Sequence, residues 1–178
     1  MKKKIIFFDG DGTIWYPKAT KRTQKPHWIY NDIITRDNYL EHLELTPKVQ
    51  ETLEVFSNKG IYLVVISANP ESEEVALKEM KEKLEYFGIE KLFYTSRVSA
   101  GDDPEGKSSI ILEILEELNL KKEDALMVGD SYYYDYLAAK NIGIDALFIE
   151  NTVSTMPEVV PFDLQSIEEV SDLLKIIE

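Results

Sequence analysis

Short apolar runs alternate along the chain with segments in which apolar residues recur at helical spacing. The apolar runs end at glycine or polar residues, as buried strands do. A regular alternation of strands and helices is typical of an α/β fold, here a doubly wound, Rossmann-like three-layer sandwich around a parallel sheet of about five strands. The predicted strands cover residues 5–8, 61–66, 91–95, 125–128 and 145–150, and the predicted helices cover 46–60, a segment that ends before Gly88, a segment from about Lys107, 131–143 and 166–177.

Three polar residues follow predicted strands at the point where each strand ends. Asp9 comes after the first strand, Ser67 after the second and Asp130 after the fourth. In open parallel sheets, ligands bind beyond the carboxyl ends of the strands. We therefore expect these three side chains, although far apart in the sequence, to meet at one edge of the sheet and to form a site there.

The segment 14–45 does not follow the alternation of strands and helices. It is too long for a simple connection between a strand and a helix. We predict that it forms an irregular flap or insert within a single domain that covers residues 1–178.

Composition and charge narrow the possible partners. The formal net charge of −13 repels nucleic acid phosphates, and no apolar run approaches the roughly 18 residues that a membrane span needs, so neither partner is expected. The absence of Cys excludes disulfides and thiolate metal sites and predicts a cytoplasmic location. A local run without acidic residues, 16–27, is either a solvated loop or a means of attracting an anionic substrate; its basic residues are Lys18, Lys21, Arg22 and Lys25.

The stretch DGDGT places the carboxylates of Asp9 and Asp11 two residues apart, each followed by a glycine. Two carboxylates at this spacing repel each other unless a cation lies between them. Oxygen ligands directly after a buried strand indicate a hard cation such as Mg²⁺. An EF-hand loop is excluded, because its sixth and twelfth positions would be Ile14 and Thr20 rather than Gly and Glu.

A second motif, GDDPEGKS at 101–108, matches the P-loop pattern and raises the alternative of a nucleotide-dependent kinase that uses Lys107 and Ser108. Its acidic residues stand where phosphates would lie, and Pro104 lacks an amide for the phosphate cradle. Lys107 is also placed, at the start of a helix, to hold a phosphoryl oxygen. We interpret the P-loop match as accidental and Lys107 as a candidate site residue.

With these residues the chain resembles the haloacid dehalogenase-like (HAD) phosphatases. All four motifs of that family are present in the family's order, from residue 5 to about residue 150. They are Asp9, Asp11 and Thr13 in D-x-D-x-T; Ser67 at the end of an apolar strand; Lys107 before a helix; and Gly129, Asp130 and Asp135 in the fourth motif.

The resemblance implies a role for each of these residues. Asp9 would be the nucleophile that becomes an aspartyl phosphate, and Asp11 would be the general acid and base. The phosphoryl group would be bound by Ser67 and Lys107, with help from Gly10 and Ala68. The ligands of Mg²⁺ would be Asp9, the backbone carbonyl of Asp11 and Asp130, with Asp135 in support.

Trp15, together with residues 45–69, resembles the magnesium-dependent phosphatase group of the family, which has no cap domain. Neither 14–45 nor 68–106 is long enough for a large cap. This resemblance implies a phosphorylated sugar, another small metabolite or protein phosphotyrosine as the substrate. A phosphomutase and a non-catalytic metal or phosphate-binding protein remain as alternatives, and the oligomeric state is not predicted.

Overall fold

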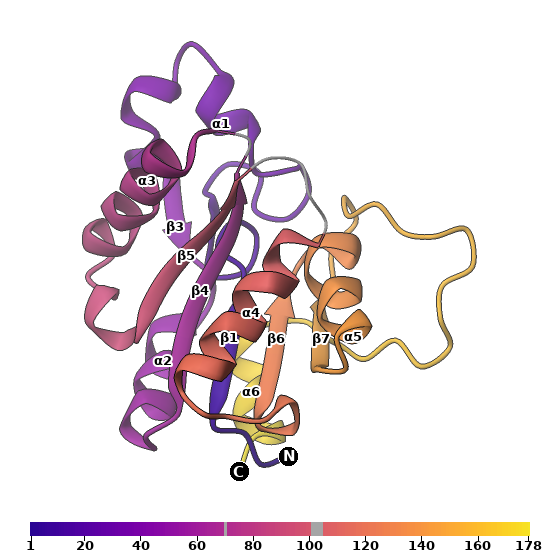
Figure 1. The fold of residues 1–178 in the computed structure, drawn as a ribbon. Helices are drawn as coiled ribbons and strands as arrows, with labels where there is room; N and C mark the ends of the chain where they lie inside the picture. The colour runs from indigo at the N-terminus through magenta and orange to yellow at the C-terminus, as the bar shows by residue number, and fades with distance from the viewer. Residues whose placement is uncertain (70, 101–104) are drawn as a thin grey trace.

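A computed structural model describes residues 1–69, 71–100 and 105–178. In this part of the chain, six parallel strands form a central sheet in the order β5-β4-β1-β6-β7-β8 (Figure 1). The doubly wound α/β architecture is confirmed, with six strands where the sequence predicted about five. The strands are β1 (Ile5–Phe8), β4 (Tyr62–Asn69), β5 (Thr95–Ala100), β6 (Ala125–Gly129), β7 (Asp145–Ile149) and β8 (Ser166–Ile167).

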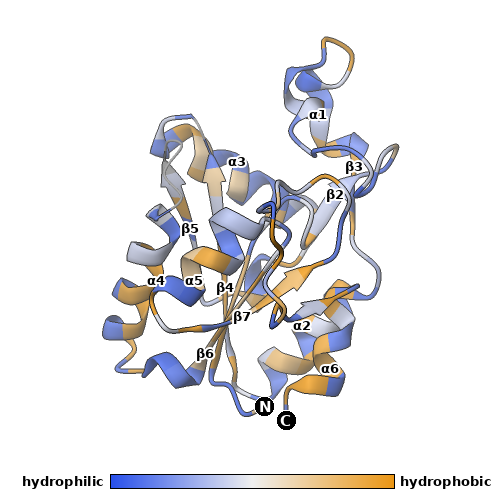
Figure 2. Ribbon diagram, turned by 90° about the vertical axis from the view of Figure 1, so that its right-hand side faces the viewer, coloured by the Kyte–Doolittle hydropathy of each residue, from blue (hydrophilic) through white to orange (hydrophobic). Residues whose placement is uncertain are grey.

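The central strand β1 separates two hydrophobic cores. Its alternate side chains point to opposite faces of the sheet, so Ile6 and Phe8 join one core and Ile5 and Phe7 the other. Helices cover both faces, which explains why β1 is apolar at every position. Figure 2 shows the same arrangement, with hydrophobic colouring along the strands and hydrophilic residues on the outer sides of the helices. One face carries α2 (Val49–Asn58), α3 (Glu73–Tyr86) and α6 (Leu173–Ile176); the other carries α4 (Gly106–Glu117), the π-helix η4 (Tyr132–Leu137) and α5 (Ala138–Asn141).

The register of the strands sets the candidate site residues at one level. Phe8 of β1 is opposite Val65 of β4 and Val128 of β6. Two residues further along each chain, Gly10, Ser67 and Asp130 therefore lie at the same edge of the sheet. The strand β4 continues to Asn69, so Ser67 and Ala68 lie inside a strand and not after its end, as the sequence had suggested.

The third strand was predicted at 91–95 and this was wrong. The chain there forms a short 3₁₀ helix, η2 (Glu90–Leu92), and the strand β5 begins at Thr95. From this connection, Leu92 and Phe93 pack against the core that contains Ile6 and Phe8. Because β5 is an edge strand, it does not need the continuous apolar run that marks a central strand.

Two of the predicted helices differ from the structure. The segment 131–143 is divided between η4 and α5, and its first part is π-helical. The segment 166–177 begins as β8, the sixth strand, and becomes helical only in the 3₁₀ helix η5 (Val170–Asp172) and in α6. Two residues of strand are too short to leave a pattern in the sequence.

The insert between β1 and α2 contains a small antiparallel pair, β2 (Trp15–Pro17) with β3 (Leu43–Leu45). The helices α1 (Trp28–Asn31) and η1 (Arg36–His42) lie between these two strands in the chain and extend the molecule beyond the carboxyl edge of the sheet (Figures 1 and 2). The base of the insert is tied to the first loop of the site, because the Thr46 hydroxyl donates a hydrogen bond to the Thr13 carbonyl over 2.9 Å.

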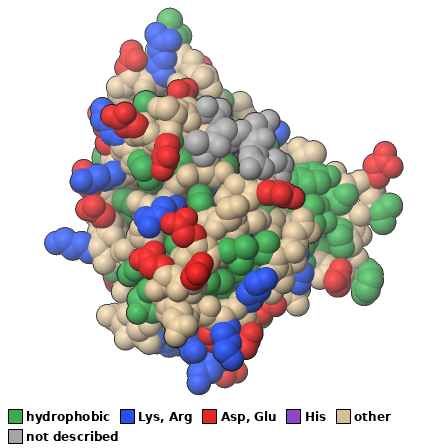
Figure 3. Space-filling model, in the orientation of Figure 1, with side chains coloured by type: hydrophobic (Ala, Val, Ile, Leu, Met, Phe, Trp, Pro, Cys, Tyr) green, Lys and Arg blue, Asp and Glu red, His purple; other side chains and the backbone are tan. Residues whose placement is uncertain are grey.

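The surface mixes acidic and basic side chains, as Figure 3 shows for one face. Hydrophobic side chains gather at the side where the long connection from β7 to β8 leaves the body of the molecule. Val159 and Phe162 of this connection are among the most exposed large apolar residues in the described chain. None of the helices described combines the length and the hydropathy needed to cross a membrane.

Candidate active site

The loop after β1 delivers Asp9 and Asp11 to the edge of the sheet. The amide of Asp9 still donates to the Val128 carbonyl of β6 over 2.9 Å, so the ladder holds Asp9 in place. The chain then turns sharply at Gly12, where φ is +87°. A Cβ atom at this position would overlap the Asp130 carboxylate. Glycine is thus required at Gly12 both by the turn and by the close approach of Asp130.

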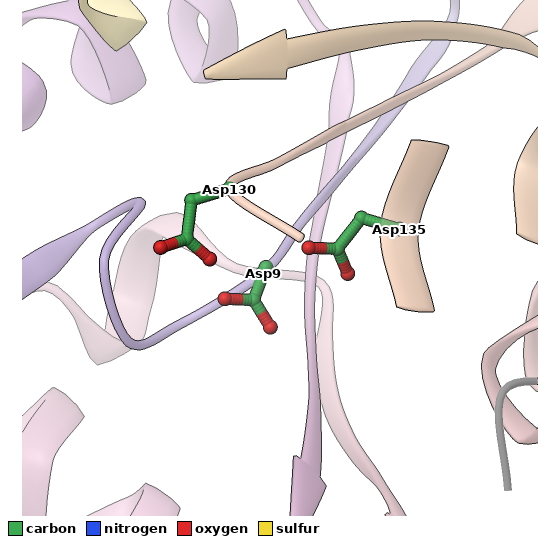
Figure 4. A group of neighbouring side chains, drawn as sticks. All are labelled: Asp9, Asp130 and Asp135. Carbon is green, nitrogen blue, oxygen red and sulfur yellow. The ribbon is translucent and has the colours of Figure 1, made fainter. Parts of the chain in front are cut away.

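Three carboxylates converge on a common space in Figure 4: Asp9 from the end of β1, Asp130 from the end of β6 and Asp135 from η4. One oxygen of each lies within 4.8 Å of the other two. Asp135 reaches this position because Gly129 has no side chain, since a Cβ there would overlap the Asp135 carboxylate. The three carboxylates that the resemblance names as cation ligands therefore lie together, and their role as ligands stays a prediction.

Lys107, near the start of α4, lies between two of these carboxylates. Its Nζ donates to Asp9 Oδ1 over 2.5 Å and to Asp135 Oδ1 over 2.6 Å, and its side chain is 2% exposed. The other oxygen of Asp135 accepts a hydrogen bond from the Ser131 amide over 2.9 Å. Asp135 thus positions Lys107 beside Asp9.

The cluster of Asp9, Asp130, Asp135 and Lys107 carries an excess of acidic groups, and this excess contributes to the pKa shifts of Asp9, Asp130 and Lys107. Burial is the largest effect on Asp9, and with the neighbouring Asp135 it raises the pKa from 3.8 to about 7, although Lys107 opposes this rise. Burial and the Asp9 carboxylate also raise the pKa of Asp130 well above its usual value. Burial alone would lower the pKa of Lys107, but Asp135 and Asp9 outweigh it and raise that pKa. One ammonium group does not compensate three carboxylates.

This donor set fits a hard divalent cation. The oxygens of Asp9, Asp130 and Asp135 are the ligand type that Mg²⁺ prefers, and their spacing allows one ion to reach more than one of them. The Asp130 peptide is held from behind, because the Asn151 side-chain amide donates to the Asp130 carbonyl over 2.8 Å. The residues present can therefore accommodate Mg²⁺.

Asp11 has different neighbours. Its Oδ1 accepts a hydrogen bond from the Tyr30 hydroxyl over 2.5 Å, and its Oδ2 lies 3.6 Å from Lys83 Nζ. Tyr30 belongs to the insert and Lys83 to α3. The sequence analysis predicted that the segment 14–45 forms a flap but assigned no role to Tyr30, and it missed Lys83. The available signal was that Lys83 continues the buried stripe of α3 formed with Ala76 and Met80, where an apolar residue is expected.

Among the described residues, those predicted to bind phosphate besides Lys107 do not contact the three carboxylates through side-chain hydrogen bonds. Ser67 and Ala68 are half-buried in β4 at the level of Gly10. In the part of the chain that the structure describes, the Ser67 hydroxyl makes no hydrogen bond to the three carboxylates. The backbone carbonyl of Gly10 accepts a hydrogen bond from the Ile14 amide over 2.9 Å and closes the turn. Their predicted roles in phosphate binding remain predictions.

The first half of the P-loop pattern, residues 101–104, lies outside the described residues. In the second half, Lys107 is paired with carboxylates and the Ser108 hydroxyl donates to the Ala138 carbonyl over 2.9 Å. Ser108 therefore ties α4 to α5 through its hydroxyl.

The basic run of the insert makes internal contacts. Arg22 donates two hydrogen bonds to the Glu169 carboxylate, at 2.9 and 3.0 Å, and its Nε donates to the Gly12 carbonyl over 2.8 Å. Lys18 donates to the Glu41 carbonyl. Arg22 thus ties the insert to the first loop of the site and to the C-terminal segment.

The sequence is similar to a family of hydrolases and to individual phosphatases. The family model described as haloacid dehalogenase-like hydrolase matches residues 4–149. An acid sugar phosphatase of Staphylococcus haemolyticus is 36% identical over 80 residues, which are 43% of this chain and 30% of that protein. An acid sugar phosphatase of Staphylococcus aureus (strain USA300) is 38% identical over 66 residues, which are 35% of this chain and 26% of that protein. The chain thus matches about a third or less of the length of these relatives.

The fold is shared with solved structures at low sequence identity. A HAD phosphatase from Thermococcus onnurineus has a TM-score of 0.67 at 21% identity, covering 99% of this chain and 97% of that chain. A hydrolase from Streptococcus pneumoniae has a TM-score of 0.64 at 19% identity, covering 86% and 96%. The family model covers most of the sequence and includes Asp9, Asp11, Lys107, Asp130 and Asp135. The chain belongs to the haloacid dehalogenase-like hydrolase family.

Proposed function

We propose that the protein is a Mg²⁺-dependent phosphomonoesterase that acts through an aspartyl phosphate on Asp9. The observation that carries the proposal is the convergence of Lys107, Asp130 and Asp135 on Asp9 at the carboxyl edge of the sheet. A nucleophilic carboxylate beside a buried ammonium group and a set of cation ligands is suited to attack on an anionic phosphoryl group. The proposal includes one domain over residues 1–178, which acts in the cytoplasm without nucleic acid or a membrane.

The cation would be held by the carboxylates of Asp9 and Asp130 and by the backbone carbonyl of Asp11. When bound, Mg²⁺ supplies positive charge that offsets the repulsion between the Asp9 carboxylate and the phosphoryl oxygens. Asp135 keeps Lys107 in position on the other side of Asp9. Lys107, with Ser67 and the backbone near Gly10 and Ala68, would bind the oxygens of the transferring group.

The reaction has two chemical steps. In the first, an Asp9 oxygen forms a bond to phosphorus while the ester P–O bond breaks, and Asp11 gives its proton to the leaving oxygen. In the second, water forms a bond to phosphorus, its proton passes to Asp11, and the bond between phosphorus and Asp9 breaks. Inorganic phosphate leaves, and both aspartates return to their initial states.

We propose a phosphorylated sugar as the substrate class, because the relatives reported above are named acid sugar phosphatases. Other small phosphorylated metabolites and protein phosphotyrosine are the alternatives that the resemblance leaves open. A screen of sugar phosphates, other phosphometabolites and a phosphotyrosine peptide, read by release of inorganic phosphate, ranks these classes. Transfer of phosphate to a second hydroxyl without its release would identify a phosphomutase instead.

The activity itself is tested with p-nitrophenyl phosphate. Wild-type protein is expected to release p-nitrophenol with Mg²⁺, and EDTA or the substitution Asp9→Asn is expected to abolish that release. Activity that survives both changes contradicts the proposal. ATP binding that is lost in Lys107→Ala but unaffected by Asp9→Asn would favour the kinase alternative.

A further inference from the structure

The pocket around Asp11 contains a buried lysine that the proposed chemistry does not use. The side chain of Lys83 is 5% exposed, although it lies on a helix whose other lysines reach solvent. Its Nζ lies 4.3 Å from the centre of the Tyr30 ring, 5.6 Å from that of Tyr39 and 5.9 Å from that of Trp15. Three aromatic rings therefore surround this ammonium group.

Burial of an ammonium group is unfavourable unless a partner compensates its charge. Among the ion pairs of the described chain, Asp11 is the carboxylate within 4 Å of Lys83. The rings add cation–π attraction, which holds the ammonium group but does not neutralise it. Lys83 is therefore directed at a carboxylate of the candidate site.

Tyr30 contacts the other oxygen of the same carboxylate. Its hydroxyl donates to Asp11 Oδ1, and its ring lies against the ammonium group that faces Asp11 Oδ2. Burial, together with the Asp11 charge, raises the pKa of Tyr30 well above its usual value. The hydroxyl therefore keeps its proton at neutral pH and donates it to the hydrogen bond with Asp11.

We propose that Tyr30 and Lys83 are positioning residues for the Asp11 carboxyl group: the Tyr30 hydroxyl binds Oδ1, and Lys83 faces Oδ2 from 3.6 Å, which leaves Oδ2 as the oxygen that carries the proton and gives it to the leaving oxygen. The inference rests on the proposed function, which makes Asp11 the general acid. A carboxyl group on a loop can rotate, and contacts from two separate elements, α1 and α3, remove that freedom. The insert then has a defined task in the reaction.

The proposal predicts a dependence on the leaving group. A basic leaving oxygen needs its proton when the P–O bond breaks, whereas a weakly basic one leaves without much help. Phenyl phosphate and p-nitrophenyl phosphate have nearly the same shape and differ mainly in the basicity of the oxygen that leaves. The ratio kcat/KM reports the first step and not the later attack of water.

The test compares Tyr30→Phe with the matched variant Tyr39→Phe, whose lost hydroxyl donates to Glu82 and not to Asp11. In Tyr30→Phe, kcat/KM for phenyl phosphate is expected to fall about tenfold, while that for p-nitrophenyl phosphate falls by less than about threefold. Tyr39→Phe is expected to keep both values within about twofold of wild type. Lys83→Met is expected to change the two substrates in the same sense as Tyr30→Phe, and Lys83→Arg to restore part of the loss.

The inference would be overturned if Tyr30→Phe showed no fall in kcat/KM or a rise. It would also be overturned by an equal fall for both substrates, because that result indicates a general structural role. Thermal unfolding of each variant is measured in parallel, and Tyr30→Phe decides the question if Lys83→Met does not fold. Asp11→Asn separates the two levels of the argument. If Asp11→Asn shows no leaving-group effect, the proposed role of Asp11 fails; if it shows one and Tyr30→Phe does not, only the role of Tyr30 and Lys83 fails.

Discussion

Asp9 and Asp11 are two residues apart in the chain, yet they are held by different parts of the molecule. Asp9 is surrounded by charged groups that come from α4, β6 and η4, elements of the sheet and its helices. Asp11 is held by a tyrosine of the insert and by a lysine enclosed in aromatic rings. The surroundings of Asp9, the proposed nucleophile, thus belong to the body of the fold, and those of Asp11, the proposed acid, belong largely to an addition to it.

This difference indicates how the two functions can change independently. The position of Asp9 depends on the strand register, because its amide bonds to β6 and its carboxylate meets Lys107. The neighbours of Asp11 depend on how α1 packs against α3, which the register does not determine. A change in the insert can therefore alter the surroundings of Asp11 while the contacts of Asp9 with Lys107 stay intact.

The largest expected effect comes from replacing each aspartate in turn. Asp9→Asn removes the nucleophile, so turnover with p-nitrophenyl phosphate is expected to fall by at least about 10³-fold, without any burst. Asp11→Asn removes the base needed for attack by water, so turnover falls strongly but about one equivalent of p-nitrophenol is released quickly. Rapid-mixing measurements of p-nitrophenol release distinguish the two results.

The control for both variants is Asp37→Asn, which changes an exposed aspartate of the insert next to Arg36 and is expected to keep full activity. A burst in Asp9→Asn would show that the covalent intermediate is formed elsewhere. It would remove the basis for comparing the two aspartates.

The next effect concerns the buried lysines. Lys107→Met leaves Asp9 and Asp135 without their shared ammonium group, and we expect kcat/KM to fall about 100-fold or more. Lys3 is a matched control, since its side chain is equally buried and its Nζ lies 2.6 Å from Oδ2 of Asp145, the first residue of β7, at the end of the strand opposite to the site. Lys3→Met is expected to lower the melting temperature but to keep kcat/KM of the folded protein. If both variants lose activity equally, Lys107 acts on stability and not on the phosphoryl group.

A third, smaller effect is expected at Gly12. Alanine there would meet the Asp130 carboxylate, so Gly12→Ala is expected to reduce the rise in melting temperature caused by Mg²⁺ and to lower kcat about tenfold. Gly60 is the matched control, because its φ of +75° is similarly strained for alanine but a Cβ there meets nothing within 4 Å. Gly60→Ala is expected to cost about 1 kcal/mol of stability and to leave the Mg²⁺ effect unchanged. An equal loss of the Mg²⁺ effect in both variants would show that the loss comes from backbone strain and not from the contact with Asp130.

The contrast between the two aspartates also explains what sequence reasoning found. The runs that form β1, β4 and β6 are apolar because both faces of the sheet are covered, and their ends therefore marked Asp9 and Asp130. The edge strand β5 and the two-residue β8 lack such runs and were missed. Tyr30 and Lys83 meet only through packing of the insert on α3, and the one local sign was a lysine on an apolar stripe. Contacts of this kind have no fixed spacing in the sequence.

The last expected effect is on stability and not on turnover, and concerns its pH dependence in metal-free protein. Burial raises the pKa of Asp9 from 3.8 to about 7, so the folded state binds a proton there more tightly than the unfolded state does. The resulting stabilisation is complete below about pH 4 and is lost as the pH rises to about 7. Asp9→Asn has no charge to bury, and its free energy of unfolding relative to wild type is expected to rise by on the order of 2 kcal/mol over that range. Urea unfolding in EDTA measures this difference.

Asp124 provides the control of opposite sign. Hydrogen bonds from the Lys121 amide and from Lys4 lower the pKa of Asp124, so its ionised form is the one that stabilises the fold. Asp124→Asn is therefore expected to be less stable than wild type by an amount that stays constant from about pH 5 to pH 7 and shrinks only in more acidic solution. If Asp9→Asn followed the same course, the charge of Asp9 would already be compensated by Lys107 alone. The carboxylate cluster would then have no excess charge to attract a cation, and the contrast between the charged surroundings of Asp9 and the aromatic surroundings of Asp11 would lose its functional meaning.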